Sequence, residues 1–166
     1  MNDHGSIVVR RAVAADRTAL GRLGAALIEA HHAFDPTRFV GASEHTADLY
    51  AAYLDRQREQ ADALVLVAED AGIVIGYCFA ANEGADPMTL RGPAGVVHDL
   101  FVDHAYRRCG VARRLLVDVR ARLFNMGAPR LMLLTAARNL PAQRLFASMG
   151  FRSTMIEMTA DTCDLP

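Results

Sequence analysis

An arginine-rich stretch in the second half of the chain has residue types suited to binding an anion. Arg107, Arg108 and Arg113 supply positive charge, and Gly110 and Ala112 lie between them. The apolar spacing becomes helical beyond Gly110, so we expect the stretch to lead into a helix. The first turn of a helix carries unpaired N–H groups and about half a positive charge, and short side chains let an anion approach that backbone. The stretch therefore predicts a phosphate-binding turn.

The segments on either side of this turn have the patterns of a strand and of an amphipathic helix. Residues 96–102 are rich in β-branched, aromatic and apolar side chains, as a buried strand requires. Beyond the turn, apolar side chains recur at helical spacing with arginines between them; they are Leu115, Leu116, Val119 and Leu123. The turn is therefore expected to connect the end of a strand to the start of a helix.

The spacing Arg107-x-x-Gly110-x-Ala112 resembles the Q/R-x-x-G-x-G/A motif of the GNAT N-acetyltransferases. The lead-in Leu100-Phe101-Val102, then Tyr106-Arg107, is similar to that family's usual approach to the motif. The resemblance implies that the amides of the turn hold the pyrophosphate of acetyl-CoA and that the preceding strand pairs with the pantetheine arm. It places these residues at the donor site: Leu100, Phe101, Val102, Arg107, Arg108, Cys109, Gly110, Val111, Ala112 and Arg113.

The remaining periodicities predict an alternation of strands and helices. We expect strands over residues 7–13, 63–68, 73–81, 96–102, 131–135 and 151–159, and helices over 16–31, 44–60, 111–127 and 139–149. Residues 63–68 are all apolar, which favours a strand covered on both faces, and the turn at 69–72 makes 63–81 an antiparallel hairpin. The order is that of the GNAT fold, an α/β mixed sheet with helices on both faces. We expect residues 1–166 to form a single domain of this kind.

Composition narrows the classes of function. The chain has 166 residues, of which 52% are apolar and 22% charged, as in ordinary globular proteins. A formal net charge of −1 gives no electrostatic case for nucleic acid or an anionic membrane. The apolar runs fall short of the ~20 residues that span a bilayer, and residues 1–6 lack the apolar region of a signal peptide. Three unpatterned cysteines suggest a reducing compartment, so we expect a cytoplasmic protein.

Two polar residues precede the donor-binding residues of the predicted strand. Acetyl transfer to an amine needs a base, because an alkylamine is almost fully protonated at neutral pH. His98 and Asp99 could each take that proton, and two adjacent acids stand here in some members that this chain resembles. Strand alternation places them on opposite faces, although a bulge, common in the family, would change that count. Asp99 is slightly preferred as the acid that orients the acceptor. Alternatively, His98 is a packed core residue and Asp99 a capping group.

The last predicted helix departs from the family pattern. Many GNAT enzymes have a tyrosine in L-Y-x-x-x-G-F that can protonate the departing thiolate, whereas this chain has Phe146. A thiol pKa near ~8.5 makes the thiolate a tolerable leaving group without that acid, and Tyr106, Ser148 or solvent could substitute. Phe146 is expected in the core, where it could also touch the pantetheine end. Asn139 matches a position that bonds the pantetheine arm in the family, and it also suits a helix cap.

Polar residues also gather where the first two helices meet. They are Glu29, His31, His32, Asp35 and Glu44, which could attract a cationic amine or simply form a polar helix end. No histidines and cysteines have zinc-ligand spacing, so we expect no metal.

The resulting prediction is a cytoplasmic N-acetyltransferase that moves an acetyl group from acetyl-CoA, its co-substrate, to a primary amine of a small molecule or peptide. The amine attacks directly in a ternary complex. By analogy with the family, we carry a homodimer as an expectation. The alternative is a GNAT-like module that binds acyl-CoA without catalysis, which Phe146 favours. A nucleic-acid-binding helix at residues 107–122 is disfavoured by the neutral overall charge and the lack of a helix-turn-helix partner.

Overall fold

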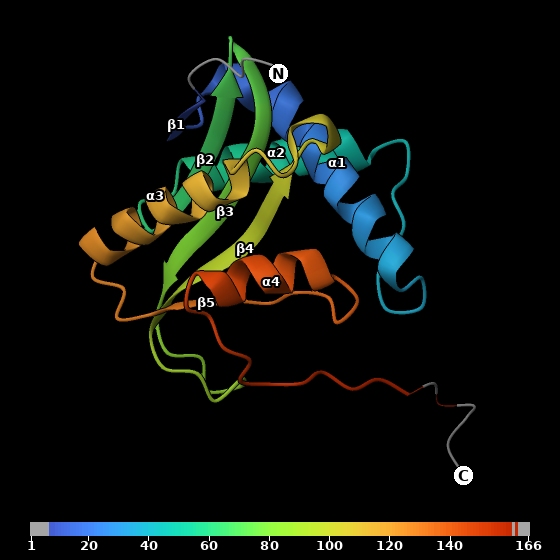
Figure 1. The fold of residues 1–166 in the computed structure, drawn as a ribbon, viewed down its shortest axis with the longest axis vertical. Coiled ribbons are helices and arrows are strands. Elements are labelled where there is room, and N and C mark those ends of the chain that lie inside the picture. The colour runs from blue at the N-terminus through green and yellow to red at the C-terminus, as the bar shows by residue number, and fades with distance from the viewer. Residues whose placement is uncertain (1–6, 161, 163–166) are drawn as a thin grey trace.

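The strands of this protein lie in the sheet in the order in which they occur in the chain. A computed structural model, which describes residues 7–160 and 162, places them in one five-stranded sheet (Figure 1). Neighbours from β1 to β4 are antiparallel, and β5 runs parallel to β4. The strands are β1 (Val8–Arg11), β2 (Ala63–Asp70), β3 (Ile73–Glu83), β4 (Ala94–Val102) and β5 (Leu131–Leu133). The predicted mixed sheet is therefore confirmed.

Helices cover both faces of this sheet, as predicted. The α1–α2 pair packs on one face, and α3 crosses the other (Figure 1). The helices are α1 (Arg17–Phe34), α2 (Thr46–Arg58), α3 (Val111–Asn125) and α4 (Leu140–Ser148), and the short 3-10 turns are η1 (Ala14–Asp16) and η2 (His104–Tyr106).

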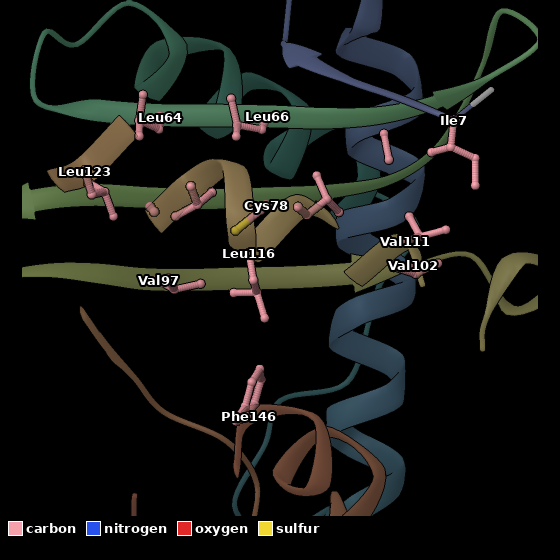
Figure 2. Packing of buried hydrophobic residues seen from close by; sticks show 14 of the residues in the cluster. Ile7, Leu64, Leu66, Cys78, Val97, Val102, Val111, Leu116, Leu123 and Phe146 are labelled. Atoms are coloured by element: carbon pink, nitrogen blue, oxygen red, sulfur yellow. The ribbon is translucent and has the colours of Figure 1, made fainter. Parts of the chain in front are cut away.

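The apolar run of β2 divides between two cores, one on each face. Leu64 and Leu66 join α3 and Phe146 of α4, and Figure 2 shows this cluster at close range. Val65 and Val67 point the other way, into the cluster beneath α1 and α2. Because successive side chains of a strand alternate between faces, an all-apolar strand has to be covered on both. This confirms the prediction made from residues 63–68.

The predicted hairpin of β2 and β3 is also confirmed. The two strands are antiparallel, and Ala71 and Gly72 form the turn between them with φ of 48° and 82°. Two consecutive residues with positive φ match the right-handed twist of a hairpin. Beyond β3, the loop of residues 84–93 is closed by a bridge between Asp86 and Arg91.

One irregularity in β4 affects everything that follows it in the strand. Phe79 pairs with Asp99, but the next residue of β3, Ala80, pairs with Val97. His98 is therefore an extra residue, a β-bulge of the kind that re-aims side chains. On the other edge of β4, pairing with β5 begins at Gly95 and stops at Val97. Beyond Val97 the described part of the chain offers β4 no second strand.

The predicted last strand, residues 151–159, is wrong. Residues 151–160 form no strand, and all but Phe151 are exposed. The only described strand next to β4 on this side is β5, which has three residues and offers little backbone to pair with. The alternation is also loose, since Met155 and Ile156 are adjacent apolar residues and both are exposed. An ion pair between Arg38 and Glu157 instead connects this segment to the loop after α1.

The remaining elements differ from the prediction mainly at their ends. For example, α1 continues to Phe34, and Asp35 before Pro36 ends it. Within the described residues, no helix has both the length and the apolar character needed to cross a bilayer.

The core under α3 generates a stability prediction. Leu116 is 1% exposed and belongs to the cluster of Figure 2. Leu116→Ala should lower the free energy of unfolding by about 2–5 kcal/mol, through lost burial and the cavity left behind. Urea denaturation measures this. The matched control is the next residue of the same helix, Val117, which is 56% exposed. Val117→Ala should change stability by less than about 0.5 kcal/mol, and equal losses in both variants would contradict the assignment of this core.

Candidate functional site

The candidate site lies where β4 separates from β5. Because pairing with β5 stops at Val97, the backbone from Asp99 to Val102 has an open edge on that side. Leu100 and Val102 face the α3 core, whereas Phe101 faces the α1–α2 core. An extended ligand arm could therefore pair with this edge as a strand does. The strand predicted to bind the donor therefore has a free backbone edge over these residues.

The turn after β4 approaches α3 through two residues in the left-handed region. Arg108 has φ of 64°, and Gly110, the residue before α3, has φ of 79°. Arg114 makes the first helical hydrogen bond, donating to Gly110 O at 3.0 Å. By helix geometry the amides of residues 111–113 have no carbonyl to bind within α3. A Cβ placed on Gly110 would meet no atom within 4 Å, so the space above the turn is open.

The three arginines of the turn have different surroundings. Arg107 donates from Nε to Val102 O at 3.1 Å, and its guanidinium lies 5.3 Å from the centre of the Phe101 ring. Arg113 donates to Ser148 Oγ of α4 at 2.6 Å, and Arg108 is exposed. Arg107 thus braces the turn against β4, and all three keep positive charge near the start of α3.

Other residues that were predicted to bind acetyl-CoA make contacts within the protein that the sequence alone could not specify. Asn139 caps α4, because its side chain accepts a hydrogen bond from Ala142 N at 3.3 Å. Phe146 is buried against the α3 core, with Phe151 at 5.9 Å between ring centres. The side chain of Val111 is also buried, so only its backbone can face a ligand. Cys109 donates from Sγ to Arg107 O at 3.5 Å, within the turn.

His98, the bulged residue, is held in one orientation by two contacts, one of which is itself fixed by Arg91. Its Nε2 lies 2.6 Å from Glu83 Oε1, and its ring stacks on Phe79 at 4.9 Å. Arg91 donates to the other oxygen of Glu83 at 2.7 Å, which fixes the carboxylate. A carboxylate is an acceptor, so Nε2 carries the hydrogen and Nδ1 is the basic nitrogen. The side chain of His98 is 39% exposed, so an incoming molecule can reach it.

Asp99, by contrast, is enclosed by tyrosines. Its Oδ2 accepts hydrogen bonds from Tyr50 at 2.5 Å and from Tyr77 at 3.2 Å. Burial raises the pKa of the Asp99 carboxyl above its ordinary value, and the two phenol hydrogen bonds oppose that rise. Burial and the nearby carboxylate together raise the pKa of Tyr50 and of Tyr77. Both phenols therefore remain donors.

Of the two alternatives for His98 and Asp99, plain alternation onto opposite faces does not hold, and the β-bulge that changes the count is present. His98 stacks on Phe79, and Asp99 bonds Tyr77, and both of these rings belong to the core beneath α1 and α2. Because the bulge inserts one extra residue, the alternation of side chains is interrupted between His98 and Asp99. Both side chains therefore face the side of the sheet that α1 and α2 cover. An imidazole and a carboxylate thereby serve one side of the sheet.

Three residues of this arrangement, Tyr50, Tyr77 and Glu83, were not predicted as site residues. For Tyr50, the glycine at position 24 within α1 is a signal that a neighbour packs closely there: a Cβ at that position would lie 2.0 Å from the Tyr50 ring. The ring therefore occupies the space that a side chain at position 24 would fill. For Tyr77 and Glu83 we find no signal in the sequence alone.

The polar residues at the junction of α1 and α2 mainly hold their own loop. His32 bonds Phe39 O at 2.8 Å, and Asp35 accepts from the Thr37 hydroxyl at 2.8 Å. His31 bonds Leu27 O at 2.9 Å and packs against Phe39, and its charge slightly lowers the pKa of Asp99. Among the described residues there is no cluster of metal-ligating side chains.

A hollow of about 300 Å³ opens beside the tyrosines. Residues of α1, of the loop that follows and of α2 line it; they are Ile28, Val40, Gly41, Thr46, Leu49, Tyr50 and Tyr53. We call it the tyrosine hollow. Tyr50 belongs both to this wall and to the surroundings of Asp99, so the hollow adjoins the candidate base residues.

Comparison with protein families and curated sequences gives consistent matches. A model described as the acetyltransferase (GNAT) family matches residues 26–151. Mycothiol acetyltransferase of Thermobispora bispora is 33% identical over 96 residues, which cover 55% of this chain and 31% of that protein. Human N-acetyltransferase 8 is 35% identical over 88 residues, which cover 53% of this chain and 38% of that protein. The chain thus matches about a third of the length of these curated relatives.

Solved structures share the fold over nearly the whole chain. A mutant protein of Bacillus halodurans superimposes with a TM-score of 0.80 at 20% identity, covering 93% of this chain and 98% of that one. An aminoglycoside N-acetyltransferase in complex with CoA gives 0.71 at 18% identity, with 98% of both chains covered. Glucosamine-6-phosphate N-acetyltransferase of Arabidopsis thaliana gives 0.67 at 17% identity, covering 95% and 99%. At these identities the likeness shows a shared fold.

The surroundings of Asp99 generate a prediction about its ionisation. Tyr50→Phe removes a hydrogen bond that favours the charged carboxylate, so the pKa of Asp99 should rise further. Carbon-13 NMR titration of the carboxyl group measures this. Tyr53→Phe is the matched control, since no hydrogen bond joins Tyr53 to Asp99 in the described structure. An unchanged pKa in Tyr50→Phe would show that this hydrogen bond contributes nothing in solution.

Proposed function

Because the chain belongs to the acetyltransferase (GNAT) family, we propose that it transfers the acetyl group of acetyl-CoA to a primary amine of a small molecule or peptide. The observation that carries the proposal is the continuous path from the open edge of β4 to the turn before α3. His98 and Asp99 stand at the beginning of that path. We also propose that residues 1–166 act as one domain, which the single sheet supports.

The donor would bind along β4 and end at α3. The pantetheine arm would pair with the open edge at residues 99–102, and the pyrophosphate would meet the amides of residues 111–113. Arg108, Arg113 and the braced Arg107 would add charge beside the phosphates. In this arrangement Asn139 and Phe146, which belong to the α4 region, would approach the pantetheine arm from the side opposite β4.

We assign the base to His98. Its Nδ1 is the basic nitrogen, because Glu83 fixes the hydrogen on Nε2. The amine gives a proton to Nδ1, and its nitrogen then forms a bond to the acetyl carbon. Asp99 would instead orient the ammonium group before the proton is transferred. We do not assign it the role of base, because its Oδ2 already accepts two phenol hydrogen bonds and the carboxylate is mostly enclosed. Deprotonation and orientation are thus divided between neighbouring residues.

The tetrahedral intermediate collapses by breaking the bond between carbon and sulfur. Its oxyanion would accept hydrogen bonds from backbone amides near the bulge, where the regular ladder is interrupted. The electron pair leaves with the sulfur as CoA thiolate, and the second proton that the attacking nitrogen still carries is lost to solvent, which leaves the neutral amide. Position 146 has no proton to give, and the Ser148 hydroxyl donates to Leu145 O at 2.7 Å. With an ordinary thiol pKa near ~8.5, the thiolate can leave and take its proton from solvent.

We further propose a cytoplasmic location and a homodimer. Cys78 is a buried free thiol, as suits a reducing compartment. The exposed apolar side chains of Leu134, Met155, Ile156 and Met158 support self-association, because a second copy could cover them.

Donor binding is tested at the turn. Gly110→Ala should weaken binding of acetyl-CoA about tenfold or more, about 1.4 kcal/mol, because a Cβ there occupies the open space that we assign to the phosphates. Isothermal titration calorimetry measures the affinity. Gly72→Ala is the matched control: its φ of 82° is close to the 79° of Gly110, and a Cβ there also meets nothing within 4 Å. Both variants should lose about 1–2 kcal/mol of stability, so equal donor affinities would overturn the phosphate assignment.

The division of roles between His98 and Asp99 is tested by turnover. His98→Gln should lower kcat about 10²–10⁴-fold while acetyl-CoA binding is retained. Glu83→Gln should give a smaller loss, since the amide can still accept from Nε2 but without charge. Thiol release from acetyl-CoA measures turnover. The exposed His45 provides a matched His→Gln control, which should behave as wild type. A large loss in Asp99→Asn with normal turnover in His98→Gln would reverse the assignment.

A further inference from the structure

The tyrosine hollow has an apolar and uncharged wall. Val40 and Leu49 are 78% and 69% exposed, although both are large aliphatic residues at its rim. Apolar area exposed to water is less favourable than the same area covered by an apolar ligand. An apolar body seated in the hollow would recover part of that free energy.

The inner wall of the hollow leads directly to the groups that handle the amine. Tyr50 donates to Asp99 at 2.5 Å, and Tyr53 packs at 5.8 Å on Phe79, the ring on which His98 stacks. Burial raises the pKa of Tyr53, the negative charge of Asp99 raises it further, and the positive charge of Arg56 opposes that rise more than Glu83 adds to it. Asp99, which Tyr50 contacts directly, is therefore the group at this end of the hollow that can pair with an ammonium group.

The wall of the rest of the hollow has no group to pair with a cation. None of the residues that line it is acidic. Of the acids nearby in the described structure, Asp35 accepts from Thr37 and Arg38 in its own loop, and Glu29, Glu44 and Asp48 are exposed to solvent outside the lining of the hollow. An ammonium group seated within the hollow would lose part of its water without gaining a counter-ion from the wall.

From this arrangement we propose that the acceptor is a monoamine with an apolar body, whose ammonium end lies at Asp99 and His98 and whose body fills the tyrosine hollow. The inference rests on the acetyl transfer proposed above. It separates this chain from an enzyme for polycationic amines, whose substrates carry further ammonium groups that need counter-ions.

The test compares two amines of equal length, n-hexylamine and 1,6-diaminohexane, which differ at the far end by one ammonium group. With the full chain and acetyl-CoA, kcat/KM from thiol release should be about tenfold or more higher for hexylamine. Binding of each amine in the presence of CoA is measured in parallel by calorimetry, so that recognition is read separately from turnover.

A variant pair locates the preference in the hollow. Leu49→Asp supplies the missing counter-ion at an exposed position, so it should narrow or reverse the preference for hexylamine in both readouts. Val117→Asp makes the same kind of change at an exposed position of α3, outside the hollow, and should leave the preference unchanged.

The outcomes distinguish this inference from the proposed function. Selective binding of hexylamine without turnover of any amine would support the hollow and overturn acetyl transfer. Equal or better use of 1,6-diaminohexane by the unmodified chain would overturn the inference and leave acetyl transfer standing. Binding of neither amine, or a preference that Leu49→Asp does not alter, would also overturn the inference.

Discussion

The extra residue at His98 is the constraint on which the geometry of the candidate site depends. Without it, the alternation of β4 would send His98 and Asp99 to opposite faces of the sheet. With it, both side chains point toward α2, and the strand turns away from its parallel neighbour after Val97. One insertion in the ladder thus brings the side chains of His98 and Asp99 to the same face, next to the backbone edge along which the donor is proposed to lie.

The two core clusters hold this irregularity in place from both sides. On one face, Val97 and Leu100 pack under α3; on the other, Tyr77 and Phe79 pack under α1 and α2. The phenol of Tyr77 lies inside the second core and donates to Asp99, so a buried hydroxyl and a half-buried carboxylate satisfy each other. The arrangement therefore contributes to stability as well as to the site.

The sequence was sufficient for features that arise from local patterns. The all-apolar residues 63–68 showed a strand covered on both faces, and the glycine and arginines after residue 102 showed the turn before α3. The partners of the candidate base residues could not be found this way, because Tyr50 is 49 positions from Asp99 and Glu83 is 15 from His98. Such pairs are set by register and helix packing. The prediction of a strand over residues 151–159 failed for a related reason. The pattern of that segment carries no information on how much of β5 is available to pair with it.

The loop between β3 and β4 starts and ends at fixed points. The Arg91 side chain binds Glu83 at 2.7 Å, and two backbone hydrogen bonds of 2.9 Å and 2.7 Å join Arg91 to Asp86. Met88 and Leu90 at the tip are exposed. The entropy of closing a loop grows only with the logarithm of its length, about 0.6 kcal/mol for each doubling. Residues 87–90 are thus a place where the chain can accept inserted segments, even a whole folded module, while the carboxylate that orients His98 stays where it is.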